Sequence, residues 1–246
     1  MLTDRQDAHG NAMWDELHGR AGEEICERDD GFVESVPISL YFESFESWSP
    51  SVRSATEFVR GRVLDIGVGA GRHALHLQEK GHDVVGIDNS PKAVEVCRLR
   101  GLEDARGCPV TQVGPFLGHV DTILMLGNNF GFIANRRRAP WLLSRLASLT
   151  APDARIVAET RDVYATDRKE HLAYHERNRA RGRMAGQVRL RIRYHLHATP
   201  WFDYLFVSPE EMEEILRPTP WRIHDVLSDD PGGQYVAILE KRARRG

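Results

Sequence analysis

The stretch from Val63 to Leu75, VLDIGVGAGRHAL, decides the fold. It joins a short apolar run to a helix-like run, with glycines at positions 67, 69 and 71 between them. Because glycine lacks a Cβ atom, the backbone of such a turn can approach a ligand closely, and the N-terminus of the following helix faces that ligand. The stretch therefore predicts a strand, a ligand-binding turn and a helix.

Similar segments follow along the chain. Apolar runs recur at residues 82–88 (HDVVGID), 121–127 (DTILMLG) and 154–160 (ARIVAET), and helical patterns lie between them. Strands that alternate with helices indicate a mostly parallel sheet with helices on both faces. We expect a doubly wound α/β fold, closed by two further strands at 221–227 and 234–241.

The regions outside this alternation have other patterns. Trp14, Leu17 and Ile25 are spaced for one helix face, and Ser49 with Pro50 marks the start of a second helix to Val59. Residues 187–197 alternate between apolar and basic side chains, as in a half-buried strand whose antiparallel partner is 201–207. We expect three parts, namely an N-terminal helical and aromatic lid segment (1–57), the main domain (58–241) with an inserted hairpin region (162–207), and a basic tail (242–246).

Composition narrows the class of protein. The 246 residues carry 33 Lys and Arg against 36 Asp and Glu, a net charge of -3, which gives no overall reason to expect a nucleic-acid partner. The apolar runs are far shorter than the ~20 residues of a membrane span, and the acidic N-terminus does not resemble a secretory signal, so we expect a cytoplasmic protein. The three cysteines, Cys26, Cys97 and Cys108, fit neither a disulfide framework nor a zinc site. We expect reduced thiols and no metal.

Two acids accompany the glycines. Asp65 lies inside the first strand, and Asp88 ends the next strand, where a carboxylate can accept hydrogen bonds from ribose hydroxyls. An adenosine-bearing ligand is therefore expected. The dinucleotide fingerprint is G-x-G-x-x-G, whereas the glycines here are separated by single residues, and this spacing counts against NAD.

The run resembles motif I of class I S-adenosylmethionine-dependent methyltransferases, D/E-x-G-x-G-x-G. The resemblance covers about residues 58–160 and the closing strands. It implies a Rossmann-like seven-stranded sheet, S-adenosyl-L-methionine as cofactor and S-adenosyl-L-homocysteine as product. In that family the first acid helps to hold the methionine end and the second binds the ribose. The expected cofactor-binding residues are Asp65, Gly67, Gly69, Gly71, Asp88, Asn89, Leu126 and Gly127. The acid that often contacts the adenine has no clear equivalent, since this position offers Cys108 and Gln112.

The segment Gly127 to Gly131, GNNFG, follows the third of these strands. It is similar to a segment of small-molecule methyltransferases such as the glycine N-methyltransferase group. An asparagine side chain both donates and accepts hydrogen bonds, so Asn128 or Asn129 can orient an amine or hydroxyl acceptor. The alternative is a polar turn and helix cap.

Three more residues are candidates for the catalytic site. Tyr41 belongs to an aromatic segment that either covers the cofactor or packs onto the sheet. Arg161 can clamp an anionic group of the acceptor or pair with a neighbouring acid. His195 is one of several histidines that can serve as a general base, if the acceptor enters protonated.

The leading hypothesis is an enzyme that methylates a nitrogen or oxygen atom of a small molecule by in-line displacement. A second hypothesis is an RNA or protein methyltransferase that uses the nine Arg and Lys residues between positions 168 and 193. A third is a cofactor-binding protein without transfer activity. The oligomeric state and the acceptor remain open at this point, because a fold does not specify a substrate.

Overall fold

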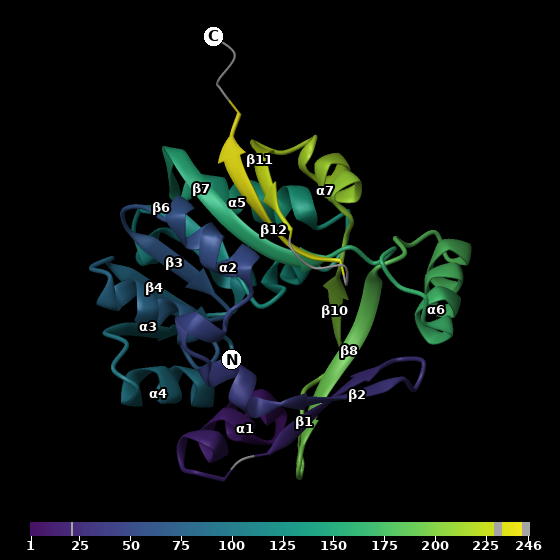
Figure 1. The fold of residues 1–246 in the computed structure, drawn as a ribbon, viewed down its shortest axis with the longest axis horizontal. Coiled ribbons are helices and arrows are strands. Elements are labelled where there is room, and N and C mark those ends of the chain that lie inside the picture. The colour runs from purple at the N-terminus through teal and green to yellow at the C-terminus, as the bar shows by residue number, and fades with distance from the viewer. Residues whose placement is uncertain (21, 229–232, 243–246) are drawn as a thin grey trace. The chain divides into compact units, whose positions relative to one another are not determined.

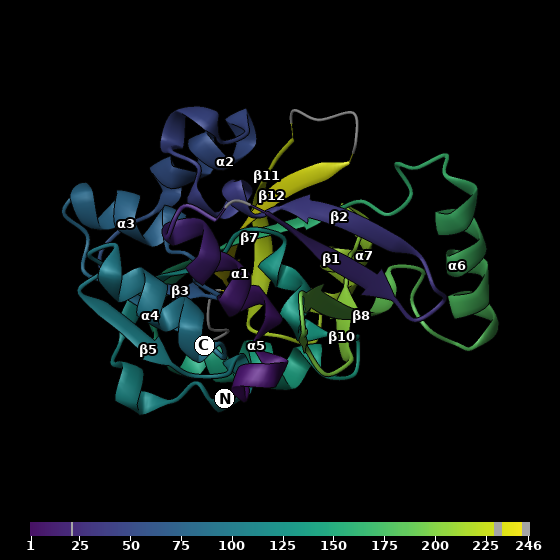
Figure 2. The ribbon, with the colours of Figure 1, turned by 90° about the horizontal axis from the view of Figure 1, so that it is seen from below.

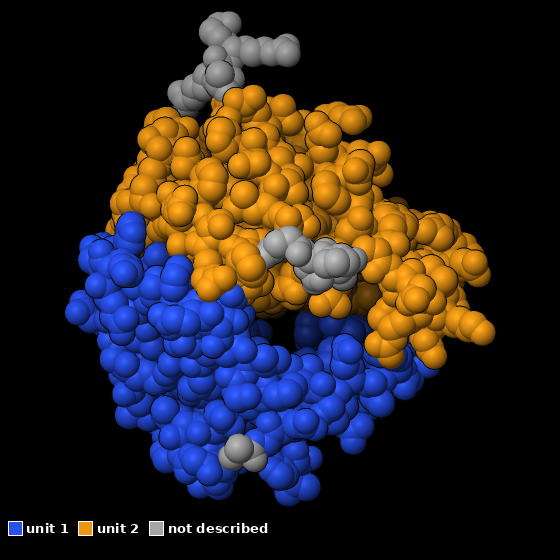
Figure 3. Space-filling model, in the orientation of Figure 1, with its two compact units in different colours: residues 1–48, 64–112, 189–202 blue, residues 49–63, 113–188, 203–246 orange. Residues whose placement is uncertain are grey.

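The computed structural model describes residues 1–20, 22–228 and 233–242. The expected basic tail lies outside the described residues except for Arg242, and so does most of the turn expected before residue 234. The chain divides into two compact units, coloured separately in Figure 3. Unit 1 comprises residues 1–48, 64–112 and 189–202, and unit 2 comprises residues 49–63, 113–188 and 203–246.

The elements are labelled in Figure 1. The α-helices are α1 (Ala8–Leu17), α2 (Pro50–Ala55), α3 (Arg72–Glu79), α4 (Pro91–Leu99), α5 (Ala139–Ser148), α6 (Lys169–Ala180) and α7 (Pro209–Leu216). The 3-10 helices are η1 (Asp4–Gln6), η2 (Ile38–Phe42), η3 (Phe45–Ser47), η4 (Thr56–Phe58), η5 (Val110–Gln112), η6 (Pro115–Leu117) and η7 (Asn129–Ile133). The strands are β1 (Glu23–Arg28), β2 (Val33–Pro37), β3 (Val63–Ile66), β4 (Val84–Asp88), β5 (Asp104–Gly107), β6 (Val120–Met125), β7 (Thr150–Arg161), β8 (Gln187–Tyr194), β9 (His197–Ala198), β10 (Phe202–Leu205), β11 (Trp221–Leu227) and β12 (Gln234–Lys241).

The larger sheet confirms the expected fold class. Its seven strands have the order β11-β12-β7-β6-β3-β4-β5. Neighbours β4 and β5, and likewise β6 and β7, run parallel, whereas β12 is antiparallel to both β7 and β11. The long strands β7 and β12 lie side by side in Figure 1. This is the doubly wound sheet predicted from the alternation of strands and helices, with the seven strands that the resemblance to class I methyltransferases implies.

The smaller, antiparallel sheet corrects the prediction for the N-terminal region. Its order is β10-β8-β1-β2, with β9 paired to β8. Ile25 lies in β1, opposite Ser35 of β2 and Arg193 of β8, and not on a helix face with Trp14. Sequence spacing alone missed this because strand pairing between residues more than 160 positions apart outweighs local helical periodicity. The inserted hairpin is therefore part of a larger sheet.

The helix starts follow the sequence closely. The side chains of Ser49, Ser90 and Ser208 each accept a hydrogen bond from a backbone N–H in the first turn of α2, α4 and α7. The second helix is shorter than expected, since α2 ends at Ala55 and a 3-10 turn continues to Phe58. The short strand β5 was not predicted, because only four residues with one buried side chain form it.

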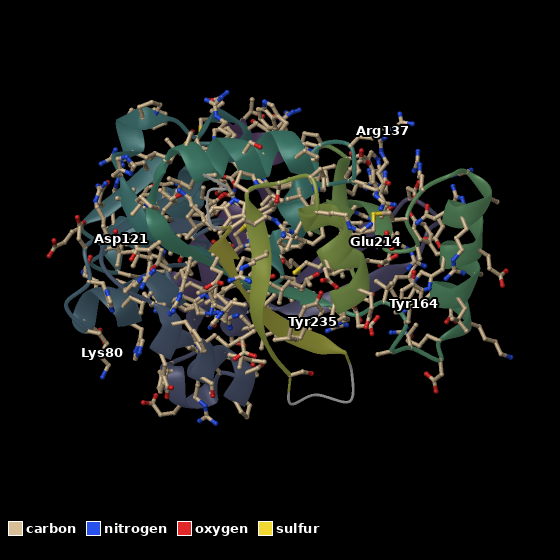
Figure 4. All side chains as sticks on the ribbon, turned by 90° about the horizontal axis from the view of Figure 1, so that it is seen from above. Lys80, Asp121, Arg137, Tyr164, Glu214 and Tyr235 are labelled. Carbon is tan, nitrogen blue, oxygen red and sulfur yellow. The ribbon has the colours of Figure 1, made fainter. Side chains whose placement is uncertain are left out.

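Each unit has its own buried contacts. In unit 1, α1 packs against α4, as Figure 2 shows from below. In unit 2, the Trp221 indole donates a hydrogen bond to the Leu143 carbonyl at 2.9 Å. The Tyr235 hydroxyl, labelled in Figure 4, donates to the Val207 carbonyl at 2.9 Å. Both side chains are almost fully buried, so both polar groups have the partners that burial requires.

Candidate functional site

The glycine turn in unit 1 is built from backbone conformations that favour glycine. Gly67, Gly69 and Gly71 have φ angles of 73°, 55° and 85°. A Cβ atom on Gly69 would lie 3.2 Å from Met13 Cε, and one on Gly71 would lie 3.1 Å from Cys97 Sγ. Any other residue would add both backbone strain and a close contact. The turn therefore keeps its backbone close to neighbouring groups, as expected of a ligand-binding loop.

Asp88 lies beside this turn, as the sequence predicts. Its Oδ2 accepts a hydrogen bond from the Gly69 backbone N–H at 3.1 Å, and its Oδ1 accepts one from Ser90 at 2.9 Å. Burial raises the pKa of the Asp88 carboxyl, and these hydrogen bonds together with nearby His9 oppose that rise. Each carboxylate oxygen keeps a further lone pair, so Asp88 can still accept hydrogen bonds from a ligand.

Asp65 is the other acid of the motif, and its side chain is only 2% exposed. Burial raises its pKa to about 7, the charge of Asp88 adds to the rise, and Arg72 opposes it. Within the described residues no hydrogen bond or ion pair reaches its carboxylate. A buried carboxyl that forms no ion pair with a described residue fits a ligand that carries positive charge.

The surroundings of these acids come partly from the N-terminal segment. Arg72 donates to the Leu40 carbonyl at 2.7 Å and to Glu43 at 3.1 Å. Asn89 is exposed, and its carbonyl accepts a hydrogen bond from the Leu2 backbone N–H at 3.0 Å. The N-terminal segment is thus bonded to the chain at two places, at Arg72 directly after the glycine turn and at Asn89 directly after β4.

A cluster of three hydrogen-bonded side chains in unit 1 was predicted only in part from the sequence. The Tyr41 hydroxyl donates to Glu24 Oε1 at 2.7 Å, and His9 Nδ1 lies 2.7 Å from Glu24 Oε2. Tyr41 was expected at the site, but His9 and Glu24 were not. Neither lies in a recognisable motif, and they are 15 positions apart. We call these three residues the His9 cluster.

The other aromatic residues of the segment pack against α3. Trp48 meets the ring of His73 edge-on at 4.6 Å, and Phe45 stacks on His76 at 4.4 Å. These contacts support the packing interpretation for both aromatic residues. Burial lowers the pKa of His73, so its imidazole is neutral at this interface.

A second group of polar residues lies in unit 2, after β6. The Glu159 carboxylate, 2% exposed, accepts hydrogen bonds from the backbone N–H groups of Gly127 and Asn128 and from the Gln234 amide. The Tyr204 hydroxyl donates to the Asn128 carbonyl. These contacts fix the Gly127–Asn128 turn, in which Asn128 has a φ of 65°. Glu159, Tyr204 and Gln234 were not predicted as site residues, because they come from three distant stretches.

Two side-chain oxygens near this turn are buried without a partner among the described residues, namely Asn128 Oδ1 and Thr160 Oγ1. Leu126 is buried, and Asn129 begins η7. An unpaired buried acceptor is costly unless a ligand supplies a donor. Asn128 is thus the asparagine with unused hydrogen-bonding capacity.

The remaining predicted site residues are exposed. Arg161 ends β7, and in the described part of the chain no ion pair joins it to Asp162 or Glu159. His195 lies in unit 1 at the turn after β8, with a φ of 49° and its ring against Tyr194. The structure therefore brings Asp65, the glycines and Asp88 together, whereas Arg161 and His195 lie at exposed positions of unit 2 and unit 1 respectively.

Part of the basic stretch is already paired. Arg191 and Arg193 on β8 both form ion pairs with Glu27 of β1, at 2.8 and 3.3 Å. Arg179 on α6 lies over the Tyr164 ring, 5.7 Å from its centroid. These contacts engage part of the positive charge of the stretch within the chain itself.

The cysteines, the groups of potential metal ligands and the lengths of the helices are also described by the structure. None of the three cysteines forms a disulfide, and the Cys97 thiol donates to the Gly69 carbonyl at 3.0 Å. Among the residues with described positions, no group of three or more His, Cys, Asp or Glu side chains is arranged to hold a metal ion. In the same set of residues, no helix has the length and apolar character to cross a membrane.

Comparisons with known proteins agree with this geometry. Residues 63–153 match a family model described as a methyltransferase domain. Glycine/sarcosine N-methyltransferase of Halorhodospira halochloris is 26% identical over 147 residues, which are 54% of this chain and 53% of that protein. The match thus spans about half the length of this curated relative.

Solved structures extend the likeness to nearly the whole chain. An S-adenosylmethionine-dependent methyltransferase from Bacteroides fragilis, crystallised with S-adenosyl-L-homocysteine, matches with a TM-score of 0.85 and 26% identity over 99% of this chain and 98% of that one. The 1,6-didemethyltoxoflavin-N1-methyltransferase of Burkholderia thailandensis matches with a TM-score of 0.50 and 20% identity over 78% of each chain, a likeness of fold alone.

The comparisons confirm the expected class, a class I S-adenosylmethionine-dependent methyltransferase. They also support the expected cofactor, S-adenosyl-L-methionine, and the expected product, S-adenosyl-L-homocysteine.

Proposed function

We propose that this chain, which carries a class I S-adenosylmethionine-dependent methyltransferase domain, transfers a methyl group to a nitrogen or oxygen atom of a small molecule. The observation that carries the proposal is the pairing of a hydrogen-bonded Asp88 beside the glycine turn with the buried, unpaired Asp65. Asp88 is suited to the diol of a nucleoside, and Asp65 is suited to a cationic group.

The residues present fit the cofactor. Asp88 would accept from the ribose hydroxyls, the backbone at Gly67 to Gly71 would line the cofactor, and Asp65 would balance its positive charge. When bound, S-adenosyl-L-methionine supplies a methyl group already activated by its sulfonium. Positioning of the acceptor in line with that methyl group then provides much of the rate.

The acceptor contacts are proposed from unit 2. Asn128 is our first candidate, because its Oδ1 is a buried acceptor without a donor among the described residues. An amine or hydroxyl N–H or O–H would satisfy it. Asn129, Arg161 and His195 remain proposals as acceptor-site residues, Tyr41 remains a proposed residue of the site, and Leu126, Gly127 and Asn89 remain proposals as cofactor contacts.

A relative supports a small-molecule acceptor. The curated relative, 26% identical over 147 residues, is named for glycine and sarcosine. RNA or protein methylation is the alternative, but Arg191 and Arg193 are paired with Glu27, which reduces the positive charge available to a phosphate backbone.

The cytoplasmic location and the domain boundaries at residues 57/58 and 162–207 also stay predictions.

Transfer of a labelled methyl group tests the proposal. The purified chain is incubated with S-adenosyl-L-methionine labelled at the methyl carbon and, separately, with a panel of small amines and hydroxy compounds, total RNA and a peptide library. We expect label in at least one small molecule and S-adenosyl-L-homocysteine in equal amount. Label found only in RNA or peptide would show that the acceptor is a macromolecule and not a small molecule. Cofactor binding without any transfer would favour a non-catalytic protein.

A further inference from the structure

The His9 cluster joins three separate elements of unit 1. His9 comes from α1, Glu24 from β1 and Tyr41 from η2. Glu24 is 1% exposed and uses both carboxylate oxygens, one for the Tyr41 hydroxyl and one for His9 Nδ1, each at 2.7 Å. The His9 and Tyr41 rings meet edge-on with centroids 4.6 Å apart. The position of the His9 ring is therefore fixed on two sides.

Stability alone is a weak reason for such a cluster. Taking a carboxylate and an imidazolium out of water is costly, and apolar side chains of similar volume often stabilise a fold as well or better. What the cluster provides is orientation, because Glu24 engages one ring nitrogen of His9 and leaves the other to point elsewhere. In the described part of the chain, no hydrogen bond is found to His9 Nε2, and its side chain is 28% exposed.

The helix that carries His9 lies against the residues around Asp88. Asp7 accepts hydrogen bonds from the backbone N–H groups of Gly10 and, across the interface, Lys92 of α4. A Cβ atom on Gly10 would come within 2.2 Å of Ser90 Oγ, which shows how closely α1 approaches the end of β4. One turn after His9, Met13 contacts the position of Gly69. His9 is thus held at the corner where Asp88 and the glycine turn meet.

Electrostatics agrees with this placement. Burial by itself lowers the pKa of His9, but Glu24, Asp88 and Asp7 together outweigh it, so the pKa of His9 lies above its usual value. A raised pKa favours the ring with a proton on both nitrogens, in which Nε2 is a hydrogen-bond donor. Asp88 nearby is an acceptor. A donor and an acceptor side by side complement a vicinal diol, since each hydroxyl both donates and accepts.

We propose that His9 is a cofactor-binding residue, whose Nε2 donates a hydrogen bond to a ribose hydroxyl of the nucleoside that Asp88 also holds. Glu24 and Tyr41 are positioning residues that act through His9. The inference rests on the proposed function, since it assigns a further contact to the same cofactor site. It adds a residue of the N-terminal segment to the ribose site.

One substitution separates the ribose contact from the structural contact. In His9→Asn the side-chain amide nitrogen takes the place of Nδ1 and can still donate to Glu24, but nothing replaces Nε2. Calorimetric titration with S-adenosyl-L-homocysteine measures the effect. We expect the affinity to fall about 5- to 20-fold, the loss of one charge-assisted hydrogen bond. The same factor is expected for 5′-methylthioadenosine, which keeps the ribose but lacks the amino-acid end.

The affinities of nucleosides with and without the ribose diol give the decisive comparison. Adenosine binding is expected to weaken in the variant, whereas 2′,3′-dideoxyadenosine is expected to bind wild type and variant within about twofold of each other. His18→Asn, on the exposed end of the same helix, is the matched control and should leave every affinity unchanged. Tyr41→Phe, which loosens Glu24 but keeps Nε2, should weaken binding by less than His9→Asn.

Three results would overturn the inference. Equal affinity of wild type and His9→Asn for S-adenosyl-L-homocysteine removes His9 from the site, even if methyl transfer falls, in which case the ring acts on the acceptor instead. Equal weakening for adenosine and its dideoxy analogue points to a general loss of structure. Failure of the wild type to bind S-adenosyl-L-homocysteine contradicts the proposed function itself, and so is distinguishable from failure of the His9 assignment.

Discussion

The glycine turn and the His9 cluster lie in the same unit but are encoded in different ways. The turn and its two acids come from one stretch of sequence, residues 63–88, in which spacing fixes geometry. The cluster comes from three elements and depends on α1, β1 and η2 being brought together. Chemistry that depends on neighbours in sequence can be predicted from a motif, whereas chemistry that depends on tertiary packing cannot.

The largest effect is expected at the turn. Asp88→Ala removes the carboxylate that accepts hydrogen bonds from the Gly69 and Ser90 backbone N–H groups, and with it the proposed ribose acceptor. We expect affinity for S-adenosyl-L-homocysteine to fall about 150-fold, because two charge-assisted hydrogen bonds contribute about 3 kcal/mol. Calorimetric titration measures it. Glu79→Ala, exposed on α3, is the control, and an unchanged affinity of Asp88→Ala would remove this residue from the site.

Asp65→Asn separates binding from stability. The pKa of Asp65 is about 7 in the folded protein against about 3.8 when unfolded, so its ionisation opposes folding, and stability falls as pH rises between these values. The variant should be more stable than wild type at pH 8, by about 4 kcal/mol, yet bind the cofactor more weakly.

Urea unfolding between pH 4 and pH 8 checks the sign. The stability difference between Asp65→Asn and wild type should shrink toward zero as the pH approaches 4. A difference that is constant over this range would show that the carboxyl of Asp65 is ionised throughout.

Two glycines with similar φ angles test whether the close approach of neighbouring side chains to the backbone matters at the glycine turn. Gly71 and Gly81 have φ angles of 85° and 90°, but a Cβ atom meets Cys97 Sγ at 3.1 Å only at Gly71, and meets nothing within 4 Å at Gly81. Alanine at either position should destabilise the fold by about 1 kcal/mol through backbone strain. Gly71→Ala should cost about 1 kcal/mol more and should weaken cofactor binding. Equal destabilisation by the two variants in urea unfolding would contradict this.

The smallest effect concerns the cluster. Tyr41→Phe removes the hydrogen bond to buried Glu24, whereas Tyr194→Phe removes one to the more exposed Asp15. We expect about 1 to 2 kcal/mol of destabilisation for the first and about half of that for the second. The ion pair between His9 and Glu24 requires a protonated His9, whose pKa is raised in the folded protein. The stability that this ion pair contributes is therefore fully present below about pH 6.5 and is lost as the pH rises through the folded pKa. Thermal unfolding of both variants at pH 6 and pH 9 makes the comparison.

The sequence predicted the strands of the main sheet other than β5, because these strands are apolar runs next to strong turn or cap signals. Asp65 and Asp88 could be proposed as cofactor-binding acids because one lies within such a strand and the other ends the next. It failed for β1, since Glu23–Arg28 is polar and becomes a strand through pairing with β2 and β8. It missed Glu159 and Gln234 because their contacts with the Gly127–Asn128 turn join strands far apart in the chain. His9 was missed because a single histidine in a polar helix has no local signature.

The most direct test of the account is calorimetric titration of the wild-type chain with S-adenosyl-L-methionine, with NAD as the comparison ligand. The account predicts binding of S-adenosyl-L-methionine at micromolar concentration and no measurable binding of NAD. Absence of S-adenosyl-L-methionine binding, or binding of NAD in its place, would contradict the assignment of the glycine turn, Asp65 and Asp88 as a methyltransferase cofactor site.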